Sequence, residues 1–269
     1  MKAIALWFFS LVPMFFAGDF KECAPCNRQD TQYLCASNTL PVNSRLCIDI
    51  TEVPAYVYKD YLASLAQKHG RESVEFKNAE PNYSLWAEVF EGHSEEELKE
   101  KFIASDELAL MPIMGISYEQ AKNFAAWRTE TMHTYLNEMS KNDRAAFPKK
   151  FKFRLPSENE WARIRFLIQD KRMLKQLEKI AKTNESSFKL SKSDLLKDNP
   201  KIKPVYFEAA EDIGFYNVFG NVAEMTSTEG VAMGGSWKVP NSTKAFAQSF
   251  SYEGASAAVG IRMIFEIIE

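Results

Sequence analysis

Four cysteines lie close together near the N-terminus, at Cys23, Cys26, Cys35 and Cys47. In an oxidising compartment such a set predicts two disulfide bonds, and all three pairings are open. A zinc ion bound by four thiolates is the alternative, because Cys23 and Cys26 are separated by two residues, as zinc ligands often are. Cys35 and Cys47 do not form a second close pair, which favours the disulfides.

A second set of reactive side chains lies in a stretch rich in glycine and aromatic residues, Gly214 to Met225. Glycines so close to aromatic side chains predict an irregular, tightly wound backbone. Its carbonyl groups need partners, and the side-chain oxygens of Asn217 and Glu224 could satisfy them through a hard cation. The alternative is that both side chains only cap the loop backbone.

The sequence lacks the residue patterns that several other activities require. The three histidines, His69, His93 and His133, do not have the spacing of an iron-binding triad or of an H-x-x-x-H pair. The sequence also lacks the G-x-S-x-G turn of a hydrolase and a phosphate-binding G-x-x-x-x-G-K-S/T loop. A net charge of -3 argues against general nucleic acid binding, which usually needs an excess of basic residues.

The first 17 residues have the pattern of a secretory signal peptide. Lys2 precedes an apolar run from Ala3 to Ala17, and polar residues follow from Gly18. The run is shorter than the roughly 20 residues that a membrane-spanning helix needs. We therefore expect an exported chain that is periplasmic, associated with the outer envelope, or secreted. An uncleaved N-terminal anchor is the alternative.

Composition divides the remainder into a cysteine-rich, irregular segment over residues 18–46 and a globular domain over 47–269. Residues 163–203 form a basic insertion, with 12 Lys and Arg against 5 Asp and Glu, a local net charge of +7. Part of this insertion has the periodicity of an amphipathic helix. It could be a solvated surface, or a patch for an acidic partner or an anionic membrane face. Residues 85–107 are acidic and offer a complementary surface.

Local patterns place the regular elements of the globular domain. Apolar residues from Ile48 to Val53 predict a short strand, and a helix is expected after Pro54. Capping-box patterns predict helices that begin after Ser94, Ser117 and Ser157. Alternating apolar residues over 259–267 predict one half-buried strand.

Several segments, in order, resemble the signature motifs of the formylglycine-generating enzyme (sulfatase-modifying factor) family. The similarity covers roughly residues 46–267. The residues that carry it include Arg154, Glu160, Trp161, Asn217, Glu224, Gly234, Gly235, Trp237 and Arg262. The resemblance implies an α+β, C-type-lectin-like fold with little regular secondary structure. This chain adds to it the insertion at about 163–203, which its own periodicity predicts to be helical.

The resemblance also implies a structural calcium ion, bound by the side chains of Asn217 and Glu224 and the backbone carbonyls of Gly220 and Val222. It does not extend to the enzyme's own chemistry. That chemistry uses two copper-binding cysteines before a terminal G-F-R motif, and no cysteine follows Cys47 in this chain. Copper(I) requires such soft thiolate ligands, so we expect neither copper nor formylglycine formation. Two further departures are G-I-R in place of G-F-R and Met225 in place of a tryptophan.

These observations predict a non-enzymatic exported scaffold or binding protein of the bacterial envelope. The chain resembles cysteine-less relatives that are lipoprotein components of gliding-motility and type IX secretion assemblies, although it shows no lipobox. A divergent enzyme that uses Ser251, Tyr252 or Glu253 is one alternative. A carbohydrate-binding lectin, by analogy of fold, is another; Gln-Pro-Asp is absent, and Glu-Pro-Asn occurs once, at Glu80-Pro81-Asn82. The expected partner is an envelope or secreted protein, with peripheral membrane contact open and no nucleic acid.

Overall fold

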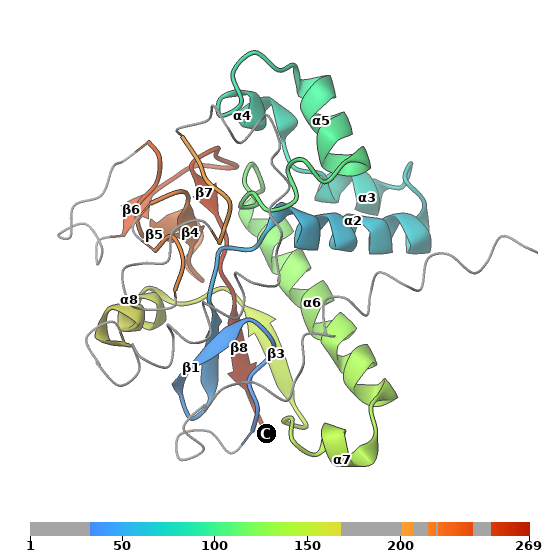
Figure 1. Cartoon of the computed structure of the whole chain (residues 1–269), viewed down its shortest axis with the longest axis vertical. Helices are drawn as coiled ribbons and strands as arrows, with labels where there is room; N and C mark the ends of the chain where they lie inside the picture. The colour runs from blue at the N-terminus through green and yellow to red at the C-terminus, as the bar shows by residue number, and fades with distance from the viewer. Residues whose placement is uncertain (1–32, 168–200, 207–214, 219, 239–248) are drawn as a thin grey trace, which may run out of the picture.

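Two small β-sheets lie beside a group of helices in this computed structural model (Figure 1). The structure describes residues 33–167, 201–206, 215–218, 220–238 and 249–269. The helices are α2 (Ala55–His69), α3 (Val74–Ala79), α4 (Tyr83–Ala87), α5 (Glu95–Ala104), α6 (Tyr118–Glu138), α7 (Lys141–Arg144) and α8 (Glu158–Leu167). The strands are β1 (Thr39–Asn43), β2 (Leu46–Asp49), β3 (Phe151–Arg154), β4 (Ala223–Met225), β5 (Val231–Met233), β6 (Phe250–Ser251), β7 (Val259–Gly260) and β8 (Ile264–Ile267). The α+β class expected from the sequence is confirmed.

The first sheet joins the two ends of the described chain. Its strand order is β1-β2-β8-β3 and all neighbouring strands are antiparallel. The C-terminal β8 therefore lies between β2 and β3, with Phe265 opposite Cys47 on one side and Phe153 on the other. Helix α6 packs along β3 (Figure 1). Closing this sheet brings Asp49 and Met263 together, since the backbone N–H of Met263 donates to a carboxylate oxygen of Asp49 at 3.0 Å.

The second sheet contains the family-like glycine motifs. Its order is β6-β5-β4-β7, and β4 pairs with β7 in parallel. In that pairing Glu224 lies opposite Gly260. A Cβ atom at Gly260 would lie 2.6 Å from the carbonyl oxygen of Ile113, so only glycine permits this close approach. Arg262 follows Gly260 by two residues, so this pairing brings the arginine close to Glu224.

The predicted helix starts are confirmed by their capping contacts. Ser94 and Ser117 form complete capping boxes at the starts of α5 and α6. At α8 the carboxylate of Glu160 accepts from the backbone N–H of Ser157 at 2.8 Å, and the hydroxyl of Ser157 accepts from the backbone N–H of Glu160 at 3.3 Å. Helix α2 follows Pro54 and buries an aromatic face that includes Tyr58. Local sequence therefore determines where these helices begin.

Two sequence expectations about strands are wrong. The segment 18–46 was expected to be irregular, but Thr39–Asn43 forms β1 and pairs with β2 across the expected domain boundary. The strand expected over 259–267 is divided into β7 and β8, which belong to different sheets. Its residues are not alternately exposed, because Arg262 and Ile264 are both fully buried. The arginine is buried because a carboxylate lies within reach, as described below.

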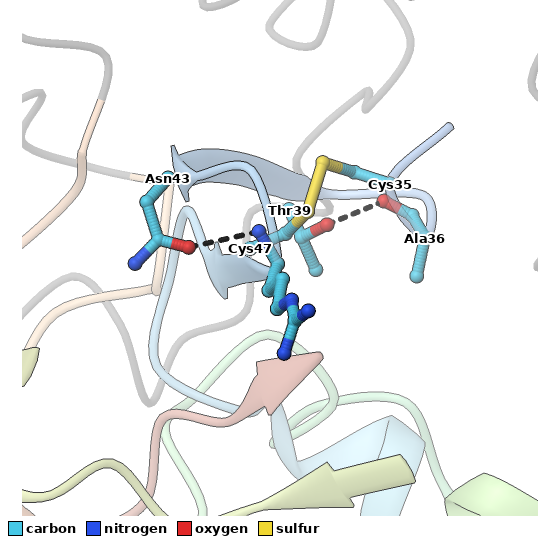
Figure 2. The surroundings of a disulfide bond; sticks show 6 residues. Cys35, Ala36, Thr39, Asn43 and Cys47 are labelled. Carbon is cyan, nitrogen blue, oxygen red and sulfur yellow. Dashed lines mark hydrogen bonds between the residues drawn. A yellow bond between two sulfur atoms is a disulfide. The ribbon is translucent and has the colours of Figure 1, made fainter. Parts of the chain in front are cut away.

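The disulfide prediction is confirmed for one pair. Cys35 is bonded to Cys47, with their Cα atoms 6.0 Å apart (Figure 2). Both cysteines are buried, and the neighbouring Thr39 hydroxyl donates to the carbonyl of Ala36 at 2.7 Å. The bond ties the chain just before β1 to the middle of β2. Cys23 and Cys26 lie outside the described residues.

Other predicted segments also lie outside the described residues. These are the signal sequence over 1–17 and most of the basic insertion, residues 168–200. Within the ranges that the structure does describe, no helix combines the length and the apolarity that a membrane span requires.

Candidate functional site

A buried ion pair between Arg262 and Glu224 lies between the two sheets. Nε and one terminal nitrogen of Arg262 donate to Oε1 of Glu224 at 3.0 and 2.8 Å. The guanidinium also donates to the backbone carbonyls of Asp49 at 3.0 Å and Tyr216 at 2.8 Å. The other oxygen of Glu224 accepts from Nε1 of Trp161 at 2.8 Å. Every one of these charged groups is inaccessible to solvent, and each has the partners that burial requires.

The glycine of the Gly-Gly-Ser-Trp motif makes room for this ion pair. Gly234 has a φ of +85°, a conformation that favours glycine. A Cβ atom there would lie 2.9 Å from Oε2 of Glu224 and 3.0 Å from the indole of Trp161. The motif therefore serves packing around the Glu224–Trp161 hydrogen bond. Gly235 is buried beside it in the turn that follows β5.

A second buried carboxyl group, Glu52, binds two asparagines. Nδ2 of Asn217 donates to one oxygen of Glu52 and Nδ2 of Asn221 to the other, each at 3.0 Å. Both asparagines have positive φ, 54° and 62°. Asn217 donates also to the carbonyl of Val205 at 3.1 Å, while Asn221 exchanges hydrogen bonds with the backbone of Lys203 at 2.8 and 3.0 Å. Glu52 thereby joins the start of α2 to two separate backbone segments.

Burial sets the protonation of these two carboxyl groups. Desolvation raises the pKa of Glu52 to about 8, and the neighbouring charge of Glu224 adds to the rise. The positive charge of Arg262 and the two asparagine hydrogen bonds oppose it. Burial also raises the pKa of Glu224, but here Arg262 makes direct hydrogen bonds that favour the carboxylate. At neutral pH we therefore expect Glu52 to be neutral and Glu224 to be ionised against Arg262.

Stability should fall as the pH rises towards 8, because of Glu52. Its pKa is about 8 in the folded protein against 4.5 as a reference, so the folded state retains a proton that the unfolded state has released. Between these values the free energy of unfolding should fall by up to about 1.4 kcal/mol per pH unit. Glu52→Gln should remove this slope. Urea unfolding at pH 5, 6, 7 and 8, with a chelator present, measures it.

The exposed Glu253 supplies the control for this measurement. Glu253→Gln should retain the slope of the unsubstituted protein, because its carboxyl group lies at the surface. An unchanged slope in Glu52→Gln would show that Glu52 is ionised in the folded state at neutral pH.

The four expected calcium ligands, which share one stretch of chain, have different surroundings. Val222 is buried and Gly220 is partly exposed. Asn217 donates to Glu52, and both oxygens of Glu224 already accept hydrogen bonds. A cation beside Glu224 would meet the positive charge of Arg262, so this arrangement does not fit calcium at that carboxylate. Among the residues described, no group of three or more His, Cys, Asp or Glu side chains could hold a metal ion. Calcium binding stays a prediction.

The remaining motif residues, Arg154 and Glu160, form a second ion pair. Two nitrogens of Arg154 donate to the two oxygens of Glu160, each at 2.8 Å, and its Nε donates to Glu266 of β8 at 2.8 Å. The guanidinium holds the pKa of Glu160 down at about 2. The pair thus ties the start of α8 to the first sheet. Its role is to position helix and sheet.

The three residues weighed for a divergent enzyme lie on and after β6. Ser251 and Glu253 are exposed, whereas Tyr252 is half-buried. Burial raises the pKa of Tyr252 to about 12, with Tyr118 and Glu229 nearby. Within the described part of the chain, its hydroxyl is buried and has no hydrogen-bond partner. A phenol with a raised pKa is a poor base or nucleophile at neutral pH, so the geometry favours no reaction here.

Glu52, Asn217 and Asn221 form a buried polar network, and only Asn217 among them was singled out from the sequence. Glu52 and Asn221 lie within segments that carry the family resemblance, Ile48 to Val53 and Gly214 to Met225. The position of Glu52 could have signalled the network, because it lies among apolar residues at a strand-to-helix junction. An acidic residue buried there needs a polar partner. The two asparagines lie over 160 positions away from Glu52 in the chain, so no local pattern identifies the contact.

Comparison with known proteins supports a family assignment. The family model described as "Sulfatase-modifying factor enzyme 1-like domain" matches residues 17–267. No curated protein matches the chain. Among solved structures, Treponema denticola variable protein 1 matches at 15% identity and a TM-score of 0.42, over 82% of this chain and 84% of that one. A crystal structure of CarF matches at 14% identity and a TM-score of 0.42, over 83% and 87%.

Proposed function

The chain belongs to the sulfatase-modifying factor enzyme 1-like family, and we propose that it is a non-enzymatic, exported scaffold that binds a protein partner of the bacterial envelope. One observation carries the proposal. The polar residues of the family motifs, Glu224 and Arg262 above all, bind each other inside the protein. They stabilise the fold and present no charged group to a substrate.

The cysteine distribution supports the same proposal. Cys35 and Cys47 are joined and buried, and no thiol follows Cys47 in the sequence. Copper-dependent oxidation of a substrate cysteine needs thiolate ligands, which the region from Lys238 to Val259 does not contain. A disulfide also suits an oxidising compartment, in keeping with the expected export.

Finer points of the proposal rest on family resemblance. They are a C-type-lectin-like arrangement of the two sheets, a structural calcium ion bound away from the Glu224 carboxylate, and a place in a secretion or gliding assembly. The mixture of α6 and α2 with two short, irregular sheets is compatible with the first of these (Figure 1). The exposed acidic residues within 85–107 offer contacts for the third.

The test is affinity purification of the tagged protein from gently solubilised native envelopes, with an unrelated exported bait as the control. We expect a set of envelope proteins at fixed stoichiometry that the control lacks. Recovery of the protein alone, also after mild cross-linking, would overturn the scaffold function. In parallel, a sulfatase peptide that carries the substrate cysteine should remain unmodified by the purified protein with copper and oxygen. Formylglycine in that peptide would overturn the non-enzymatic assignment.

A further inference from the structure

Two lysines lie over the indole ring of Trp237, the last residue of the Gly-Gly-Ser-Trp motif. Nζ of Lys201 is 5.2 Å from the ring centroid and Nζ of Lys238 is 5.1 Å from it. The ring is half-buried, and its Nε1 donates to the carbonyl of Ala257 at 2.9 Å, which fixes its orientation. Ammonium groups at this distance from an aromatic face are attracted to it. The result is an oriented aromatic surface with two positive charges.

Two carboxylates of the same chain form ion pairs with these lysines. Oε2 of Glu88, which caps the end of α4, accepts from Lys238 at 2.7 Å. Glu91, three residues later, pairs with Lys201, and Lys201 donates as well to the backbone carbonyl of Glu88 at 2.8 Å. A turn of chain with two acidic residues at a spacing of three therefore already binds this surface. It shows which ligand chemistry fits.

These ion pairs are exposed enough to be exchanged. The side chains of Glu88 and Lys238 are 43% and 44% exposed, and in the second pair Glu91 is 77% and Lys201 28% exposed. Water competes for charges at such positions, so pairs of this kind contribute little to stability and open readily. Lysine also accepts carboxylates from many directions, because its ammonium group acts as a compact point charge. A partner could replace the two glutamates without unfolding the protein.

We propose that Lys201, Trp237 and Lys238 form a docking surface for an acidic peptide segment of a partner protein. Glu88 and Glu91 occupy this surface when the partner is absent, and the partner's carboxylates displace them. The tryptophan supplies the apolar contact, a residue type that dominates binding energy at many interfaces. The proposal rests on the scaffold function proposed above and gives that function a contact surface.

The probe is a fluorescein-labelled helical peptide with two glutamates three residues apart, and its binding to the full chain is followed by fluorescence anisotropy. Glu88→Gln/Glu91→Gln should bind the peptide about three- to tenfold more tightly than the unsubstituted protein, because its internal competitors are gone. Lys201→Gln/Lys238→Gln should bind at least about tenfold more weakly. Binding should weaken as salt is added.

Lys122→Gln is the matched control. Lys122 also pairs with a glutamate, Glu119, and also lies over an aromatic ring, that of Tyr118, at 5.4 Å. It is a single lysine, so its loss should leave peptide affinity unchanged. A peptide in which glutamine replaces both glutamates should not bind. Circular dichroism of each variant confirms that it is folded.

The outcomes separate this surface from the scaffold function. Equal peptide affinity in the two double variants would overturn the docking surface. So would envelope complexes that form with Lys201→Gln/Lys238→Gln as they do with the unsubstituted chain, and the scaffold function would then stand with its contact elsewhere. Peptide binding with the expected pattern, but no envelope complex, would overturn the scaffold function alone.

Discussion

Arg262→Met should lower the free energy of unfolding by about 3–5 kcal/mol, the largest loss that we expect from a single substitution in the described structure. The guanidinium is inaccessible to solvent and donates to Glu224, to the carbonyl of Asp49 and to that of Tyr216. Methionine fills a similar volume but leaves the Glu224 carboxylate buried without its cation. Urea unfolding at pH 7, followed by far-ultraviolet circular dichroism, measures the loss.

A double variant distinguishes the loss of the ion pair from simple disruption of packing. Arg262→Met/Glu224→Gln contains neither charge, and its glutamine can still accept from Trp161. It should therefore be more stable than Arg262→Met alone, and once Glu224→Gln is measured as well, the double-mutant cycle should give an interaction energy of about 1–3 kcal/mol. The exposed Arg45 gives the surface control, since Arg45→Met should change stability by less than about 0.5 kcal/mol. Additive losses at positions 262 and 224 would contradict the coupling described here.

Removing the disulfide between Cys35 and Cys47 should cost about 3 kcal/mol. The two cysteines are 12 residues apart, and closing a loop of this size removes conformational freedom chiefly from the unfolded chain. The comparison is best made in a Cys23→Ala/Cys26→Ala background, where these two remaining cysteines are the only source of a bridge. Addition of a reductant during urea unfolding should lower the midpoint in that background.

The same experiment contains its own control. Once Cys35→Ala/Cys47→Ala is added to the background, the reductant should have no further effect on the midpoint. Because both cysteines are buried, reduction of the folded protein should also be slow, and faster in urea. Equal midpoints with and without reductant in the background protein would show that the bridge contributes nothing to stability.

The sequence predicted helices better than strands, and the reason is the range of the interactions. The starts of α5, α6 and α8 depend on contacts three residues apart, Ser94 with Glu97 for example, which a local pattern reveals. The end of the chain is different. Its alternation of apolar residues predicted one strand with Arg262 facing solvent, but Glu224 lies within reach and makes burial favourable. A contact between residues 38 positions apart is invisible to a pattern of period two.

The buried polar residues also show what a local sequence pattern cannot predict. Asn217 and Glu224 were chosen from the sequence as ligands for a common cation, and the structure gives them different partners, Glu52 and Arg262. Residue types indicated that buried carbonyl and carboxylate groups need partners. They did not indicate whether a cation, an arginine or an amide supplies the contact, because that choice depends on which distant segments meet.

The place of β8 in the first sheet has a consequence for synthesis of the chain. Ile264–Ile267 pairs on one side with β2 and on the other with β3, so β3 has no partner strand and β2 has only β1 until translation reaches residue 267. Roughly 200 residues separate β2 from β8, and at typical elongation rates they take on the order of 10–40 s to synthesise. During that interval the nascent chain lacks the strand that closes its sheet, and contacts of such long range also form slowly. The first sheet therefore closes only late in synthesis, and premature termination before Ile264 would leave one side of β2 and one side of β3 open to pairing with other chains.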